Sequence, residues 1–180
     1  MSEAVLPKLG GQHRAYRGAS DEWYTPPELI EALLMCGPRP WAFDLDPCAP
    51  APENRKHSYA DRCYSLLEDG FTQRWDGNVW LNPPYGPEVG KWLKKLADHG
   101  EGIALIFART ETDWFQKQVF ERASGVLFLR GRLHFYDKNW QRAKFNAGAP
   151  SALVAYGEFF SEVLAEAVDA KRIPGRFVRL

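Results

Sequence analysis

Four consecutive residues, Asn82-Pro83-Pro84-Tyr85, have the clearest potential for chemistry in this chain. A proline fixes its own φ angle, has no N–H to donate, and keeps the preceding residue out of the helical region, so this segment should form a stiff loop. Such a loop can direct the side-chain oxygen of Asn82 and the carbonyl oxygen of Pro83 at one point, where they could hold both hydrogens of an exocyclic amine. These acceptors bind more strongly as positive charge develops on an attacking nitrogen, which favours the transition state. Because Tyr85 could also stack on the ring that carries the amine, we expect Asn82, Pro83, Pro84 and Tyr85 to form a catalytic loop.

The elements that position this loop follow from the spacing of apolar residues. We expect strands over residues 41–46, 78–81, 103–108 and 152–156, and a strand pair over 126–136 that is broken at Gly131. We expect helices over residues 87–97, 112–122 and 160–170, an irregular segment over 47–77, and a basic tail after the last helix. Strands that alternate with helices predict an α/β fold with a mostly parallel sheet flanked by helices. Such sheets bind ligands at the carboxyl ends of their strands.

Regular structure should begin at residues 25–28, Thr-Pro-Pro-Glu, which have the form of a capping box with proline in the first helical turn. Leucine and isoleucine at helical spacing then predict a helix that ends at Gly37. Residues 1–20 are polar and lack the apolar stretch of a signal peptide, so we expect a flexible lead-in. Residues 21–180 are enough for a single catalytic domain with a real core.

Composition and charge exclude several classes of protein. No apolar run is long enough to span a membrane. Three irregularly spaced cysteines (Cys36, Cys48 and Cys63) argue against a disulfide framework and favour a reducing cytosol. The spacing of Cys48, His57 and Cys63 fits no common zinc pattern, so we expect no metal. Because the formal net charge is zero, any contact with nucleic acid must come from a local basic face.

The segment Asn82-Pro83-Pro84-Tyr85 resembles the catalytic motif of amino-group DNA methyltransferases. Further segments narrow the resemblance to the phage-type DNA N6-adenine methyltransferases, a Dam-like family. The resemblance implies a Rossmann-like class I methyltransferase fold, S-adenosylmethionine as methyl donor, and double-stranded DNA as substrate, with the target adenine turned out of the duplex. The matching segments run in order from about residue 21 to 157, and they are Asp21–Pro26, Phe43–Ala49, Asp69–Phe71, Trp80–Gly86, Arg109–Phe115 and Gly131–Phe135.

On this resemblance the segment Phe43–Ala49 is the cofactor motif, a strand that ends in carboxylates. A carboxylate at a strand end can bind the amino group of the methionine moiety or a ribose hydroxyl. Asp46 matches the motif better, and Asp44 is the second candidate. No Gly-x-Gly follows the strand, so Pro47, Cys48 and Ala49 must form the cofactor turn with small residues instead.

Other segments are also expected at the cofactor. Tyr24, Thr25 and Pro26 resemble the segment that closes over the methionine end of the donor. Asp69 and Phe71 are candidates for its adenine end, where a carboxylate can accept from the amino group and an aromatic ring can pack on the base. A secondary contact of the donor is expected with Asn82.

Basic and aromatic residues interleave in the second half of the chain, which suits phosphate contact and base stacking. They are Arg109, Trp114, Arg130, Arg132, Phe135, Tyr136, Lys138, Trp140, Arg142 and Lys144. We expect Arg109, Trp114 and Arg132 to contact DNA, and Phe135 to hold the target base together with Tyr85.

Two alternative functions remain open. The same loop could serve an amine methyltransferase that acts on RNA or on a protein glutamine, and a different class would be a catalytically inactive DNA-binding module. Incubation with labelled donor and each acceptor separates them. We expect a monomer, with a dimer as the alternative, in the cytoplasm of a bacterial host if the gene is carried by a phage or prophage.

Overall fold

The computed structural model describes residues 23–38, 40–55, 57 and 59–180. The seven strands of the described residues are β1 (Phe43–Asp46), β2 (Ala60–Cys63), β3 (Val79–Leu81), β4 (Gly102–Phe107), β5 (Gly125–Leu129), β6 (Ser151–Tyr156) and β7 (Gly175–Arg179). The helices are α1 (Pro27–Leu34), the short 3-10 turn η1 (Pro52–Asn54), α2 (Val89–His99), α3 (Asp113–Phe115), the π-helical turn η2 (Gln116–Phe120) and α4 (Glu158–Asp169).

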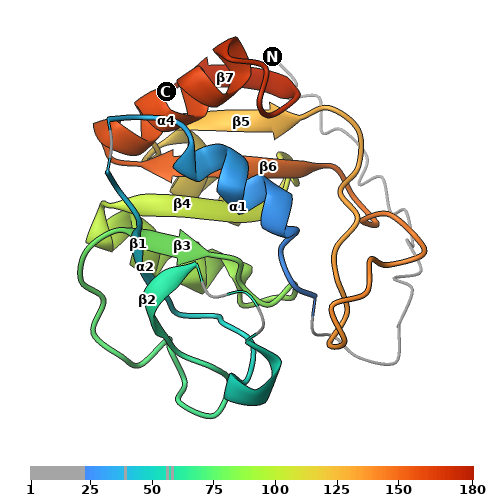
Figure 1. The fold of residues 1–180 in the computed structure, drawn as a ribbon. Coiled ribbons are helices and arrows are strands. Elements are labelled where there is room, and N and C mark those ends of the chain that lie inside the picture. The colour runs from blue at the N-terminus through green and yellow to red at the C-terminus, as the bar shows by residue number, and fades with distance from the viewer. Residues whose placement is uncertain (1–22, 39, 56, 58) are drawn as a thin grey trace, which may run out of the picture.

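The strands form one sheet in the order β2-β1-β3-β4-β6-β5-β7 (Figure 1). The pairings β1–β2, β1–β3 and β3–β4 are parallel, whereas β4–β6, β5–β6 and β5–β7 are antiparallel. The α/β fold is therefore confirmed, but parallel pairings make up one half of the sheet and not most of it. That half carries the motifs at Asp46 and Asn82.

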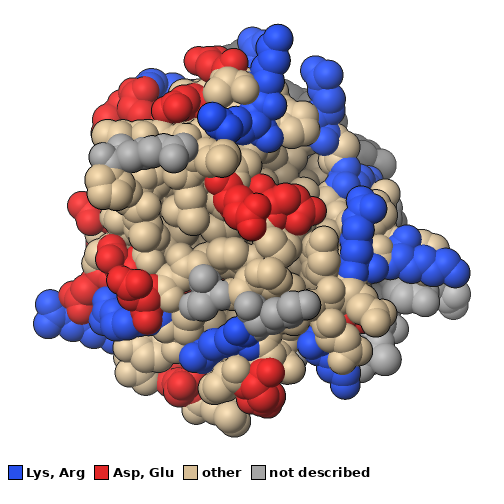
Figure 2. Space-filling model, viewed as in Figure 1, with Lys and Arg blue, Asp and Glu red and all other residues tan. Residues whose placement is uncertain are grey.

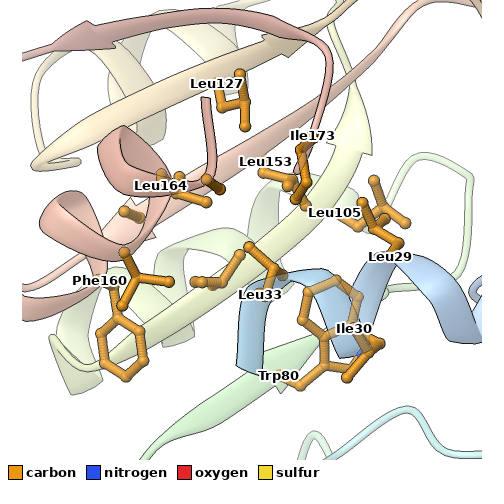
Figure 3. Close-up of a cluster of buried hydrophobic side chains, with 14 of the residues drawn as sticks. Leu29, Ile30, Leu33, Trp80, Leu105, Leu127, Leu153, Phe160, Leu164 and Ile173 are labelled. Atoms are coloured by element: carbon orange, nitrogen blue, oxygen red, sulfur yellow. The ribbon is translucent and has the colours of Figure 1, made fainter. Parts of the chain in front are cut away.

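Helices cover both faces of this sheet. On one face, apolar residues of α1 and α4 pack on Leu105, Leu127 and Leu153 (Figure 3). On the other face, α2 and the α3–η2 segment pack on Ala104 and Ile106. Consecutive residues of β4 thus point to opposite layers, as an alternating buried strand requires. The two clusters hold the central strands rigidly between the helices.

The chain leaves β1 toward β2 on one side and returns to β3 on the other side of β1. The strand order therefore reverses between β1 and β3. In parallel sheets, ligands bind outside the carboxyl ends of the strands at such a reversal. Here Asp46 ends β1 and Asn82 follows β3, so both predicted motifs lie at this one place.

Several predicted elements differ from the structure. The expected strand pair over residues 126–136 is a single strand, β5, because Gly131 adopts a φ of +82° and turns the chain into a loop. The expected basic tail is the edge strand β7. The segment 47–77 contains β2, whose four residues are too few and too polar to show an alternating pattern.

The start of α1 is also different from the prediction. Pro26 occupies the N-cap position and no side chain caps the helix, so the capping box is absent. Thr25 is buried instead. The predicted lead-in over residues 1–20, and Asp21 and Glu22 of the first motif, lie outside the described residues.

Candidate active site

The catalytic loop begins at Asn82, directly after β3. The side-chain Nδ2 of Asn82 donates to the main-chain oxygen of Trp23 at 3.1 Å. This bond turns the other side of the amide, Oδ1, away from Trp23. Oδ1 is buried and has no hydrogen-bond partner among the described residues. An unsatisfied buried acceptor is costly, so its presence here suggests that a ligand supplies the missing donor.

The prolines of the loop have different environments. Pro83 is buried, and its carbonyl oxygen accepts no main-chain hydrogen bond within the described residues. Pro84 is exposed. Among the described residues, nothing donates to Asn82 Oδ1 and no main-chain N–H donates to the Pro83 oxygen, so two available acceptors follow each other at the end of β3.

A small pocket brings the predicted motifs together. Five of its lining residues were expected from the sequence, namely Tyr24, Thr25, Asp46, Cys48 and Asn82. The other lining residues were not predicted at the cofactor, although Trp23 and Trp80 belong to the matched segments and Trp140 was named for base stacking. These residues are Trp23, Pro50, His57, Tyr59, Trp80 and Trp140. The pocket thus joins the carboxyl ends of β1 and β3 to the segment before α1 and to two long loops.

Asp46 is the acidic group of this pocket. Its side chain is buried, and Oδ1 accepts a hydrogen bond from the main-chain N–H of Cys48 at 3.0 Å. Burial raises the pKa of Asp46 from 3.8 to about 7, against the opposing effects of the Cys48 N–H and the positive charge of Arg55. A cationic or hydroxyl-bearing ligand that replaced the lost solvation would return this carboxyl group to its charged form.

Asp44 has a structural role that Asp46 lacks. The N–H groups of Asp44 and Leu45 both donate to the carbonyl oxygen of Asn78, at 2.8 and 3.2 Å, as in a β-bulge. The carboxylate of Asp44 accepts from the N–H of Asn78 at 2.6 Å. Gly77 precedes it with a φ of +74°, and a Cβ there would lie 2.3 Å from Asp44 Oδ2. Asp44 therefore holds the turn into β3 and does not line the pocket.

The segment before α1 closes the pocket through a long-range pairing. Tyr24 and Tyr136 exchange two main-chain hydrogen bonds of 2.9 and 3.0 Å. Trp140 packs on the ring of Tyr24 at 5.0 Å between ring centroids, and its indole N–H donates to the oxygen of Asn54 at 2.6 Å. The loop after β5 and the loop after β1 are thereby joined over the pocket.

Tyr59 offers a second polar atom without a partner. Its hydroxyl is buried and makes no hydrogen bond within the described residues. Burial, followed by the negative charges of Glu31 and Glu28, raises the pKa of this hydroxyl above its usual range. Tyr59 therefore remains a neutral donor, and nothing in its local sequence predicted this position.

Tyr85 is packed inward. Its ring stacks on Phe107 at 4.2 Å between centroids and meets the edge of Phe135 at 5.8 Å. Its hydroxyl is buried without a hydrogen-bond partner among the described residues, and burial raises its pKa well above the usual value. The rings of Tyr85 and Phe135, which were predicted to hold the base together, are therefore in contact, and the Tyr85 ring packs on Phe107.

The remaining predicted cofactor residues surround the turn after β1. Pro47 and Ala49 are buried in that turn. Gly70 packs against it so closely that a Cβ would lie 2.1 Å from the Pro47 oxygen. Its neighbour Asp69 is exposed, and Phe71 packs on Trp92 of α2 instead of lining the pocket. Pro26 is buried but faces a second hollow beyond α1.

The predicted DNA-contacting residues are spread more widely. Arg109 is exposed just after β4. Trp114 is half-buried, and its Cβ lies against Gly90 of α2. Arg132 is exposed on the loop after β5 and donates to the carbonyl of Ala147 at 3.0 Å. Of the three, only Arg132 borders the hollow beyond α1.

The described part of the chain also contains histidine, cysteine and acidic side chains outside the pocket. No group of three or more His, Cys, Asp and Glu side chains is placed there to bind a metal ion. No disulfide joins any two of Cys36, Cys48 and Cys63. Among the described helices, none has the length and apolar character to cross a bilayer.

A comparison with protein families matches residues 13–172 to the model described as DNA N-6-adenine-methyltransferase (Dam). Comparisons with curated proteins and with solved structures gave no match. The family match covers most of the chain, includes all six motif segments between residues 21 and 135, and confirms the resemblance to DNA N6-adenine methyltransferases. The chain belongs to the family of DNA N-6-adenine methyltransferases.

Proposed function

We propose that this chain transfers a methyl group from S-adenosylmethionine to the N6 amine of an adenine that has been turned out of double-stranded DNA. The family implies DNA adenine N6-methylation in general. The observation that supports this reaction most directly is the buried, unpartnered Oδ1 of Asn82 at the end of β3. We propose that residues 21–180 act as a single catalytic domain and that the protein works as a monomer.

The fold is proposed to be a Rossmann-like class I methyltransferase fold. Its support is the parallel set β2-β1-β3-β4, with helices on both faces and a reversal of strand order between β1 and β3. The candidate site lies at the carboxyl ends of these two strands, where open α/β sheets bind their ligands.

The residues of the pocket fit S-adenosylmethionine. Asp46 is a buried carboxylate suited to the ammonium group or a ribose hydroxyl, and the Tyr59 hydroxyl is a neutral donor that needs an acceptor. Tyr24 and Thr25 would close over the methionine end, with Pro47, Cys48 and Ala49 forming the turn beneath. Asp69 and Phe71 remain proposed for the adenine end, next to that turn. When bound, the donor supplies a methyl group already activated by positive sulfur.

The catalytic loop acts on the adenine. Asn82 Oδ1 and the Pro83 carbonyl accept the two amine hydrogens, and both acceptors gain strength as the nitrogen becomes positive. Pro84 keeps the loop stiff. Because Phe107 covers one face of the Tyr85 ring, the adenine would stack on the other face, next to Phe135. The neutral amine attacks before it loses a proton, so no general base is needed at Tyr85.

DNA contacts are proposed for Arg109 and Trp114 beside the catalytic loop, and for Arg132 on the loop after β5. Arg109 and Arg132 are exposed and the ring of Trp114 is half-exposed, as contact with a duplex requires. A charged contact to a phosphate positions the duplex without reading its sequence.

Incubation with tritiated S-adenosylmethionine and separate DNA, RNA and protein acceptors tests the function. We expect label only in DNA, recovered as N6-methyladenine after digestion to nucleosides. Label in RNA or in a protein glutamine would establish the first alternative. Donor binding without transfer to any DNA would establish an inactive DNA-binding module. Asn82→Ala is the negative control for methyl transfer by a contaminating enzyme.

A further inference from the structure

A second hollow lies outside the candidate active site, between α1, the loop after β5 and the connection from α4 to β7. It is larger than the pocket at Asn82. Four arginines line it, three from the loop after β5 (Arg130, Arg132 and Arg142) and one from the connection between α4 and β7 (Arg172). In the view of Figure 2, Lys and Arg side chains gather along the upper right of the molecule, on the side where Figure 1 places the loop after β5.

These arginines carry unbalanced positive charge. None of the four forms an ion pair within the part of the chain that the structure describes. Arg132 donates to the Ala147 carbonyl and Arg172 to the sulfur of Met35, both uncharged partners. The guanidinium groups of Arg130 and Arg142 have no partner among the described residues. Glu28 of α1 is the one carboxylate in the lining, so the hollow retains a net positive charge.

The floor of the hollow is apolar. Leu29 and Ile173 are buried, and Leu133 is half-buried against the same cluster. The walls are fixed to each other, because the N–H of Arg130 donates to the Pro174 oxygen at 2.9 Å. A rim of guanidinium groups over an apolar floor suits a ligand that has anionic groups next to apolar surface.

The hollow and the catalytic loop share one segment of chain. His134 lines the hollow, whereas its neighbour Phe135 meets the ring of Tyr85. Leu133 and Phe135 are held from behind by hydrogen bonds to residues 147 and 143. A DNA strand that crosses residues 133–135 could place a phosphate in the hollow on one side and a base at Tyr85 on the other.

We propose that this hollow holds the sugar–phosphate backbone of the substrate DNA, with phosphates on Arg130 and Arg142 and a deoxyribose on the apolar floor. The proposal rests on the proposed function. It also gives a reason for choosing DNA over RNA, because a ribose would bring a 2′-hydroxyl against the apolar side chains of Leu133 and Ile173, which offer it no hydrogen bond. The site extends the DNA contacts beyond Arg109 and Trp114.

The test is the affinity of the full chain for a fluorescent 20-base-pair DNA, measured at several salt concentrations with the Arg130→Gln/Arg142→Gln variant. Each lost phosphate contact lowers the slope of log affinity against log salt by about 0.9. We expect the slope to fall by about 2, a loss of affinity of at least tenfold at physiological salt, and a smaller preference for DNA over RNA of the same sequence. Affinity for S-adenosylmethionine should not change.

The control removes the same charge elsewhere, with Arg62→Gln/Arg74→Gln. Both arginines pair with Asp76 near β2, away from the hollow. This variant should keep the salt slope to within about 0.5. Arg130→Lys/Arg142→Lys should also keep most of it, because lysine retains the positive charge. If the double glutamine variant does not fold, each single glutamine variant should lower the slope by about 1.

Several outcomes would overturn the proposal. They are an unchanged slope in the glutamine variant, equal affinity of the wild-type chain for DNA and RNA, or arginine-dependent binding of deoxyadenosine monophosphate or polyglutamate but not of DNA. The proposed function is judged separately from methyl transfer by the wild-type chain. Transfer to DNA with an unchanged slope refutes only the backbone site, and arginine-dependent DNA binding without transfer refutes only the reaction.

Discussion

The side-chain N–H of Asn82 donates to the main-chain oxygen of Trp23, residues that lie 59 positions apart in the chain. This bond has two effects. It fixes which end of the Asn82 amide faces the pocket, and it ties the segment before α1 to the loop after β3. The group that would receive the adenine amine is therefore oriented by the same segment that closes over the donor.

Asn82→Ala should lower the single-turnover rate of methyl transfer by about 100-fold or more, because the loss of one transition-state acceptor costs on the order of 3 kcal/mol. Asn82→Asp should also lose most activity. It keeps an oxygen in the pocket but replaces the N–H that Trp23 accepts. Quenched-flow measurements with saturating donor give both rates. A near wild-type rate for Asn82→Ala would exclude Asn82 from catalysis. A near wild-type rate for Asn82→Asp would show that the hydrogen bond to Trp23 is dispensable.

Substitutions of the two carboxylates of β1 should have different effects on donor binding and on stability. Asp46→Asn should weaken donor binding in calorimetric titrations by about tenfold or more, the effect of one lost charged hydrogen bond. Asp44→Asn should leave the donor affinity unchanged but lower the free energy of unfolding by about 1–2 kcal/mol, because the bond to the Asn78 N–H is weakened. The reverse pattern would assign the cofactor to Asp44.

These two residues also show what sequence can and cannot predict. The cofactor motif offered two carboxylates, with Asp46 as the better match and Asp44 as the second candidate. The shared hydrogen bonds at Asn78 interrupt the alternation of side chains along β1, and a bulge of this kind leaves no mark in four residues of sequence. The ends of β1 and β3 were predictable because proline motifs act locally on the backbone.

The far wall of the pocket was not predictable for a different reason. Tyr59 and Trp140 belong to long loops, and they reach the pocket only because Tyr24 pairs with Tyr136 and because Trp140 bonds to Asn54. Contacts across such sequence distances follow from tertiary packing and not from local pattern. The edge strands β2 and β7 were missed because short, polar strands lack an alternating apolar face.

The buried Asp46 should make stability depend on pH. Its pKa is about 7 in the folded chain and near 4 when exposed, so the folded state binds more protons between these values. The stabilising contribution of its proton is then complete below about pH 4 and is lost as pH rises to about 7. The free energy of unfolding can be measured with urea for the wild type and for Asp46→Asn. The value for the wild type minus that for the variant should therefore fall as pH rises through this range, and should be constant above it. A difference that rises with pH would mean that the carboxylate is stabilised in the folded chain.

Tyr59→Phe should affect binding without harming the fold. The hydroxyl has no partner among the described residues, so its removal should leave the free energy of unfolding unchanged or slightly higher. If the hydroxyl bonds to the donor, affinity for S-adenosylmethionine should fall by about three- to tenfold, as expected for one neutral hydrogen bond. Tyr64→Phe, directly after the other end of β2, is a matched control. Equal affinities in all three proteins would remove Tyr59 from the cofactor site.

Tyr85 should act through its ring and not its hydroxyl. Tyr85→Phe keeps the stack on Phe107 and removes a buried hydroxyl that has no partner, so methyl transfer and stability should stay close to wild type. Tyr85→Ala should lose most activity, because an aromatic wall contributes roughly 1–3 kcal/mol per stacked base. Its melting temperature should also fall, since removal of a buried aromatic ring costs about 3 kcal/mol and each 1 kcal/mol lowers it by about 2–4 °C in a domain of this size.

The opposing view is that the Tyr85 hydroxyl removes a proton from the amine. Burial raises its pKa, so its ionised form is even scarcer near neutral pH than that of an exposed tyrosine. A hydroxyl in this state is a poor base, and the amine can attack while it still carries both hydrogens. Single-turnover rates of Tyr85→Phe and Tyr85→Ala on one DNA substrate decide between the two roles. Thermal melts of both variants show whether a loss of activity comes from lost stacking or from unfolding. If phenylalanine is as inactive as alanine while its melting temperature is unchanged, the hydroxyl takes part in the reaction and the stacking role is wrong.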